Sequence, residues 1–168
     1  MVIPDAHWRA LQVVAERLDG SRVRWALSGT AALSAHGIDV ACRDLDLVTT
    51  VDGVNATMHL LAEFAVGSVG STTRGNIRAY LGVLRIHGCD VDVLGDVQNE
   101  LPDGQWTPVI DVTPQLVAVA ALSRAVPVLP LEQLLAAYES MGRAETAALI
   151  SEALAAQRCI TVVTDREA

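Results

Sequence analysis

The sequence predicts an α/β or α+β domain, with a mixed β-sheet flanked by helices and a helical C-terminal end. The chain has 168 residues, of which 51% are apolar and 19% are charged, enough apolar material for the core of one domain. Segments with helical periodicity alternate with short strand-like segments, and two helical segments follow at the end. We therefore expect a single domain over residues 1–168, with a core at about 20–112 and a helical part at about 113–158.

The first third predicts a helix, a strand and a short helix. Trp8, Leu11 and Val14 recur at helical spacing within residues 4–18, which predicts an amphipathic helix. Residues 23–27 are predicted to be a short strand. A turn at 28–30 and a short helix at 31–35 follow.

The middle third predicts strands separated by turns. Residues 45–50 are rich in Leu, Val and Thr and predict a strand, with a turn at 52–53 and a helix at 54–65 behind it. The remaining assignments are a loop or hairpin at 68–75, strands at 77–86 and 89–94, and a polar loop at 99–106.

The last third contains an apolar run at 116–122. Its periodicity fits a strand and a buried helix equally well, and we assign a strand. Residues 126–130 are expected to be extended, because a proline restricts the residue before it. Helices are predicted at 131–141 and 144–156, hinged at Gly142.

The charge and composition exclude several classes of function. The chain has 20 acidic residues and 12 basic ones for a net charge of −8, and every basic residue is an arginine. No lysine is present to act as a Schiff base or general base, and the negative charge argues against broad nucleic-acid binding. No apolar run approaches the roughly 20 residues of a membrane span, and no signal peptide is visible. Three scattered cysteines and four scattered histidines argue against a zinc site, and with the other features predict a cytoplasmic protein.

One segment combines a glycine turn with closely spaced carboxylates. A strand runs into Ser28, Gly29 and Thr30 at the start of a helix, where free backbone N–H groups favour a phosphate. Asp44 and Asp46 follow at the start of the next strand, and residues two apart in a strand share a face. Leu45 and Leu47 are then expected to face the core.

Paired carboxylates of this kind suit a hard divalent cation. Two parallel carboxylates repel each other, and Mg²⁺ resolves this while keeping sites for water and substrate phosphate. A later strand carries a second pair, Asp90 and Asp92, which also share one face. A third carboxylate would complete a clamp for two metals about 3.5–4 Å apart.

These motifs resemble the polymerase-β-like nucleotidyltransferases. The resemblance is to the small bacterial branch that includes lincosamide-type antibiotic nucleotidyltransferases and abortive-infection type toxins. It rests on the 28–33 segment (Ser-Gly-Thr-Ala-Ala-Leu), on His36-Gly37 and on the Asp-Leu-Asp of residues 44–46. It implies an enzyme that moves an NMP from an NTP to an acceptor hydroxyl with release of pyrophosphate. The acceptor stays open between a small molecule, tRNA and a protein.

The resemblance also implies roles for individual residues. Ser28, Gly29 and Thr30 would bind the β- and γ-phosphates, and Mg²⁺ or Mn²⁺ would be held by the three carboxylates Asp44, Asp46 and Asp92, with Asp90 as the alternative third carboxylate. Arg143 matches a family arginine that contacts phosphate. Where related proteins carry a Lys and an Asp, this chain has Tyr138 and Thr146 (or Ala147).

Those two departures leave other functions open. The chain is alternatively a degenerate member of the fold that binds a nucleotide or a protein without catalysis. It is also alternatively the toxin of a toxin–antitoxin pair, with a cognate protein partner. Arg74, Arg78 and Arg85 form either a phosphate- or RNA-binding patch or a solvated face. An oligomer that completes the acceptor pocket is a further hypothesis.

Overall fold

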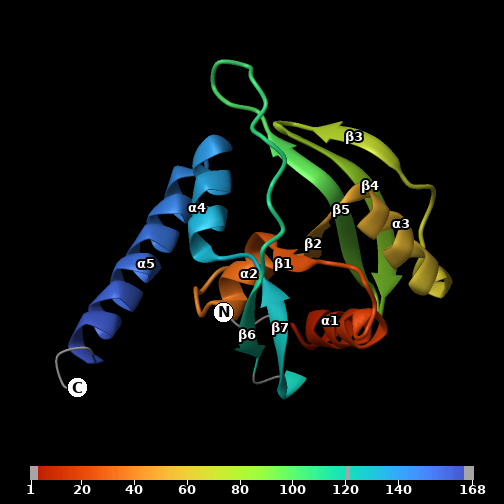
Figure 1. Cartoon of the computed structure of the whole chain (residues 1–168), viewed down its shortest axis with the longest axis horizontal. Helices are drawn as coiled ribbons and strands as arrows, with labels where there is room; N and C mark the ends of the chain where they lie inside the picture. Colours follow the sequence, from red (N-terminus) through yellow and green to blue (C-terminus); the bar gives the residue numbers. More distant parts are fainter. Residues whose placement is uncertain (1–3, 120–121, 165–168) are drawn as a thin grey trace.

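The computed structural model describes residues 4–119 and 122–164, the last seven of these as backbone alone. Seven strands form one mixed sheet in the order β3-β4-β5-β2-β1-β7-β6 (Figure 1). The strands are β1 (Ala26–Ser28), β2 (Leu45–Thr49), β3 (Gly70–Arg74), β4 (Ile77–Ile86), β5 (Cys89–Asn99), β6 (Gln115–Val119) and β7 (Arg124–Val128). The helices are α1 (Asp5–Leu18), α2 (Gly29–Ala35), α3 (Val51–Leu60), the 3₁₀ turn η1 (Ala62–Phe64), α4 (Leu131–Ser140) and α5 (Ala144–Thr164). The predicted fold class is confirmed.

The strand pairings bring distant parts of the chain together at the centre of the sheet. β2 lies between β1, with which it is antiparallel, and β5, with which it is parallel. β7 pairs with β1 in parallel, so residues near the end of the chain join the same sheet as the N-terminal strands. The helical C-terminal part begins at Leu131. Within the described ranges, no helix is long and apolar enough to cross a membrane.

Helices cover the two faces of the sheet. α1 and α3 pack against β5, and α3 also packs against β4. On the other face, Leu134 and Tyr138 of α4 lie over Asp46 and Val48 of β2, around a shared cavity. α5 packs on α4 as an outer layer (Figure 1). The core between these layers is apolar and includes Leu11, Leu27, Leu47, Leu84 and Ile150, all less than 2% exposed.

The turn predicted at Asp52 and Gly53 is wrong, because both residues lie inside α3. Thr50 caps this helix: its side-chain oxygen accepts a hydrogen bond from the Gly53 N–H at 3.1 Å. Asp52 lies in the first turn, where its negative charge interacts favourably with the helix dipole. The Asp-Gly pair signals a turn in many sequences, but here the cap outweighs it. The helix also ends earlier than predicted, at Leu60, before the separate 3₁₀ turn.

Other boundaries differ in ways that follow from strand pairing. β5 continues to Asn99, well past the predicted end at 94, because β4 supplies partners along its whole length. The loop or hairpin at 68–75 contains an ordered edge strand, β3. The apolar run forms β6 and not a buried helix in its described part. Leu116 is 74% exposed on this edge strand, and residues 120–121 of the run lie outside the described residues.

Two glycines let α3 lie close to the sheet. A Cβ atom at Gly82 would meet the Met58 sulfur at 2.7 Å, and one at Gly95 would meet the backbone oxygen of Thr50 at 3.0 Å. The Met58 side chain can move, whereas the Thr50 backbone is fixed by the helix that starts there. The contact at Gly95 therefore sets the distance between α3 and the sheet.

We expect Gly95→Ala to destabilise the fold by about 1–3 kcal/mol, because the added methyl group overpacks a contact with backbone atoms. Gly70→Ala is the matched control, since Gly70 also lies in a strand but nothing lies within 4 Å of its added Cβ. Urea unfolding of both variants measures the difference. Equal stability of the two variants would contradict this account of the packing.

Candidate active site

Three side chains lie in one row across three adjacent strands. Ser28 of β1 pairs with Asp46 of β2, and Asp46 pairs with Asp92 of β5. Paired residues in neighbouring strands project from the same face of a sheet, so the hydroxyl and the two carboxylates share a face. Asp44 stands just before β2 and adds a third carboxylate.

Buried leucines and valines fix which face the carboxylates occupy. Leu45 and Leu47 of β2 and Val91 and Val93 of β5 are each at most 1% exposed. Because successive side chains alternate between faces, Asp46 and Asp92 must project to the other side. The predictions that Leu45 and Leu47 face the core are confirmed.

The turn after β1 lies in close contact with the Asp46 side chain. Gly29 has φ +60°, a conformation that strains any other residue, and a Cβ on it would overlap the Asp46 carboxylate. Ser28 precedes α2 in extended conformation, and its hydroxyl makes no capping hydrogen bond to that helix. The first N–H groups of α2 therefore lie beside the carboxylate row, together with a free hydroxyl.

The electrostatics of the row disfavour its full ionisation. Burial raises the pKa of Asp46 to about 7, with further contributions from the charges of Asp44 and Asp92, and Arg143 acts in the opposite direction. Burial also raises the pKa of Asp92, against which the Arg74 guanidinium acts at 3.6 Å. A cluster of carboxylates with raised pKa values is typical of functional sites.

A cavity of about 540 Å³ opens between this face of the sheet and α4. It contains the predicted phosphate-binding residues Ser28, Gly29, Thr30 and Arg143 together with Asp44 and Asp46. Its other end is mostly apolar, formed by Val48, Ile77, Leu94, Val97, Ile110, Leu134, Ala137 and Met141, with Asn99 and Tyr138 as polar members. The volume is that of an ordinary small-molecule pocket.

Two predicted carboxylates lie elsewhere. Asp92 stands beside Asp46 but does not line this cavity. Asp90 is exposed and forms an ion pair with Arg85 at 2.7 Å. Of the two candidates for the third carboxylate, Asp92 is therefore the one in register with Asp46.

At the other side of the cavity, Arg143 stands between α4 and α5. Its backbone N–H donates to the Tyr138 carbonyl at 2.9 Å, and its guanidinium lies 5.7 Å from the centre of the Tyr138 ring. Tyr138 is only 3% exposed and lines the cavity. Thr146 lies on α5 and is not part of the cavity wall.

A bulge in β5 decides which residues reach the apolar end. Tyr80 pairs with Gly95 and Arg78 with Gln98, so β5 has one more residue than β4 between these pairs. The extra residue is Asp96, with φ +50°. Beyond the bulge the alternation is reversed, and Val97 and Asn99 line the cavity in line with Leu94.

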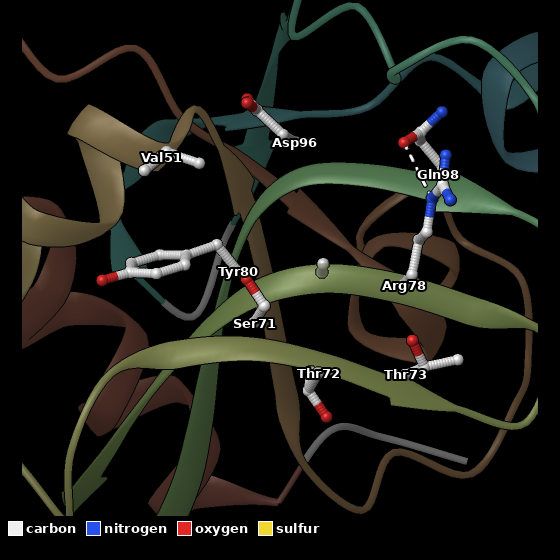
Figure 2. Close-up of a pocket in the computed structure, with 9 residues that line it drawn as sticks. Val51, Ser71, Thr72, Thr73, Arg78, Tyr80, Asp96 and Gln98 are labelled. Carbon is white, nitrogen blue, oxygen red and sulfur yellow. Dashed lines mark hydrogen bonds between the residues drawn. The ribbon is translucent and has the colours of Figure 1, made fainter.

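The same bulge places Gln98 on the opposite face, beside Arg78 of β4. There they line a second, smaller hollow of about 320 Å³ with Val51, Tyr80 and Asp96 (Figure 2). Arg78 donates to the Gln98 side-chain oxygen at 2.9 Å and lies 4.5 Å from the centre of the Trp106 ring. Since Arg74 pairs with Asp92 and Arg85 with Asp90, the three arginines do not form one patch.

The two carboxylates in the cavity fit a cation whose remaining ligands are water and substrate oxygens. Among the described residues, no three His, Cys, Asp or Glu side chains form a group that could hold a metal ion. Asp44 and Asp46 nevertheless present two carboxylates to the cavity beside the phosphate-binding turn. Mg²⁺ characteristically takes one or two carboxylates, several waters and substrate phosphate oxygens.

The raised pKa of Asp46 predicts a dependence of stability on pH. Its folded pKa of about 7 exceeds the ordinary value of 3.8, so the fold favours the protonated form. This contribution is fully present below about pH 4 and is lost as the pH rises through about 7. Relative to wild type, Asp46→Asn should gain on the order of 2–4 kcal/mol at pH 8, in the absence of divalent cations, and little at pH 4.

Urea unfolding of both proteins at pH 4 and pH 8 checks this expectation. Asp52→Asn, an exposed change of the same kind on α3, is the control; it loses only a favourable helix-dipole interaction of about 0.3–1 kcal/mol and should show no gain at pH 8. The same stability difference between wild type and Asp46→Asn at both pH values would contradict it.

Several solved structures have a fold similar to that of this chain. The chain is similar to a candidate nucleotidyltransferase from Thermotoga maritima, with 28% identity over 91% of this chain and 95% of that one and a TM-score of 0.76. It also resembles ANT(2″)-Ia in complex with adenylyl-2″-tobramycin, at 12% identity, 95% and 97% coverage and a TM-score of 0.56. The lincomycin-bound lincosamide adenylyltransferase LnuA gives 12% identity, 81% and 86% coverage and a TM-score of 0.51.

No protein-family model and no curated protein matches the sequence. The fold comparisons agree with the family that the sequence resembles. The chain has the nucleotidyltransferase fold, and the resemblance to that superfamily is confirmed.

Proposed function

We propose that the protein transfers a nucleoside monophosphate from an NTP to an acceptor hydroxyl and releases pyrophosphate. The observation that supports this is the row of Ser28, Asp46 and Asp92 across β1, β2 and β5, with the Gly29 turn against it. A phosphate-binding turn and a carboxylate row at one place are what such a reaction requires. The similarity to a candidate nucleotidyltransferase over most of both chains adds to this support.

In this proposal the chain binds the triphosphate through three groups. The Ser28 hydroxyl and the backbone N–H groups of Gly29 and Thr30 donate to the β- and γ-phosphates. Arg143, on the opposite side of the cavity, balances their charge with a guanidinium that matches phosphate geometry. Tyr138 holds that guanidinium in place over its ring.

Mg²⁺, or Mn²⁺, would be held by Asp44 and Asp46. When bound, it would neutralise the clustered negative charge and withdraw electrons from the α-phosphate. Without a cation, burial and the neighbouring carboxylates raise the pKa of Asp46. A bound cation would favour the ionised form of this carboxylate. Arg143 and Arg74 offset only part of the charge of the carboxylate row, so the site favours a divalent cation.

Asp92 is the proposed base for the acceptor. The acceptor oxygen forms a bond to the α-phosphorus, the bond from that phosphorus to the bridging oxygen of the leaving group breaks, and pyrophosphate departs. The acceptor's hydroxyl proton passes to Asp92. Burial raises the pKa of this carboxylate, which makes it a better proton acceptor than an exposed aspartate.

A second function is favoured by one observation. The family resemblance implies a lysine and an aspartate where this chain has Tyr138 and Thr146, and their absence would suit a protein that binds a nucleotide without turning it over. The two functions share the nucleotide site but differ in pyrophosphate release, so the following two experiments separate them.

Calorimetric titration of the four NTPs with Mg²⁺ tests the nucleotide site. We expect metal-dependent binding to wild type and to Asp52→Asn, and loss of at least tenfold in affinity for Asp44→Asn/Asp46→Asn, because two carboxylates that would hold the cation are gone. Asp52 is exposed on α3 and serves as the matched control. No binding to wild type, or equal binding to the double variant, would overturn the proposed site.

Pyrophosphate release tests catalysis and the choice between Asp92 and Asp90. With a panel of antibiotic, tRNA and protein acceptors, Asp92→Asn should lower the rate by roughly 10²–10⁴-fold and keep Mg²⁺–NTP binding. Asp90→Asn is the control on the same strand and should stay near wild type, since Asp90 forms an exposed ion pair with Arg85. Nucleotide binding without release for any acceptor would instead support the non-catalytic function.

A further inference from the structure

We propose that His36 is a positioning residue of the nucleotide site. It holds the start of α4, and through this helix Arg143, in place relative to the phosphate-binding turn. The inference rests on the proposed function, because it assumes that Arg143 contacts the triphosphate. His36 does not line the cavity itself, so its role is to place other groups and not to contact a substrate.

One hydrogen bond joins the end of α2 to the start of α4. The Nε2 atom of His36 lies 2.8 Å from the carbonyl oxygen of Leu129. A carbonyl oxygen only accepts hydrogen bonds, so Nε2 carries the proton and the imidazole ring is the donor. The two residues are 93 positions apart in the sequence. The bond therefore connects the N-terminal part of the site with the helical C-terminal part.

The backbone of His36 is fixed at the end of α2. His36 is the C-cap of this helix, and Gly37 follows it with φ +86°. The Ile38 N–H donates to the Leu33 carbonyl at 2.9 Å, which closes the helix end as a Schellman motif. α2 begins at Gly29, in the phosphate-binding turn. One short helix thus has the turn at its start and the histidine at its end.

The acceptor of the bond lies in the connection that sets the direction of α4. β7 and α4 are separated only by Leu129 and Pro130. The Leu129 N–H donates to the Leu27 carbonyl of β1 at 3.0 Å, and the Leu129 carbonyl accepts from His36. Pro130 has φ −56°, which its ring fixes. The connection is therefore tied to β1 just before the phosphate-binding turn and to α2 just after it.

α4 depends on this connection because the cavity separates much of it from the sheet. Leu134, Ala137 and Tyr138 of α4 line the cavity, and Arg143 follows beyond its C-terminal end. Among the described residues, no side chain of α4 forms a hydrogen bond or ion pair with the sheet or with α2. A helix of 10 residues is about 15 Å long, so a small rotation at its start displaces Arg143 substantially. Groups that bind a reacting phosphate are sensitive to such displacements.

Calorimetric titration of inorganic tripolyphosphate with Mg²⁺ tests this role, because the probe presents phosphates without a base. His36→Leu should lower the affinity roughly three- to tenfold, the effect expected from one lost hydrogen bond. His36→Gln should bind as wild type does, since its amide nitrogen reaches about as far as Nε2. His36→Asn is too short to reach Leu129 and should resemble His36→Leu. His59→Leu, at an exposed histidine of α3, is the matched control and should match wild type.

A double-mutant cycle with Arg143→Gln distinguishes positioning from a general loss of stability. If His36 acts through Arg143, His36→Leu should change the affinity less than about twofold once Arg143 is replaced. An equal loss with and without Arg143 would overturn the inference, and so would equal binding by wild type and His36→Leu. If His36→Leu does not fold, His36→Gln and His36→Asn are compared in the same two backgrounds.

Amide hydrogen exchange separates failure of the inference from failure of the proposed function. The N–H groups of Gln133 and Leu134 donate to the Pro130 carbonyl in the first turn of α4. Without ligand, they should exchange faster in His36→Leu and His36→Asn than in wild type and His36→Gln. If wild type binds tripolyphosphate but affinity and exchange are the same in every His36 variant, only the role of His36 is overturned. If wild type binds no tripolyphosphate, the nucleotide site is overturned, and the inference with it.

Discussion

The site depends on one constraint, the alternation of side chains along two parallel strands that lie side by side. Burying Leu45 and Leu47 on β2 and Val91 and Val93 on β5 supplies the hydrophobic stabilisation of the sheet centre. The same alternation forces Asp46 and Asp92 to the opposite face in adjacent positions. A shift of either strand by one residue would bury the carboxylates and expose the apolar residues, so the register of the core is also the register of the site.

The sequence was informative where a feature is local and less so where it depends on pairing. The glycine turn at Gly29, the position of Asp46 and the burial of Leu45 and Leu47 could be predicted, because each follows from a short motif or from strand periodicity. The bulge at Asp96 could not be predicted, because it is defined by the pairing of β5 with β4 and no residue type indicates it. The places of Val97 and Asn99 in the cavity wall depend on that bulge, so they could not be predicted either.

The helix that begins at Val51 shows a competition between two local signals. Asp52 and Gly53 favour a turn, whereas Thr50 and the first-turn position of Asp52 favour a helix. The Thr50 cap outweighs the turn signal, and packing adds to it, because Gly82 and Gly95 provide a flat surface on which α3 can lie close to the sheet. The sequence around residue 50 contains both signals but not the surface, which is made by Gly82 and Gly95 much further along the chain.

The electrostatics of the carboxylate row are unfavourable when no cation is bound. An asparagine at position 46 would fit the same space without the desolvation and repulsion that raise the pKa of Asp46 to about 7. The fold carries this unfavourable charge at the point where Gly29 leaves no room for a larger side chain. A divalent cation that carries a phosphate would relieve this desolvation and charge repulsion. Tyr138 lines the same cavity as Asp44 and Asp46, and the carboxylates that create this need remain in place beside it.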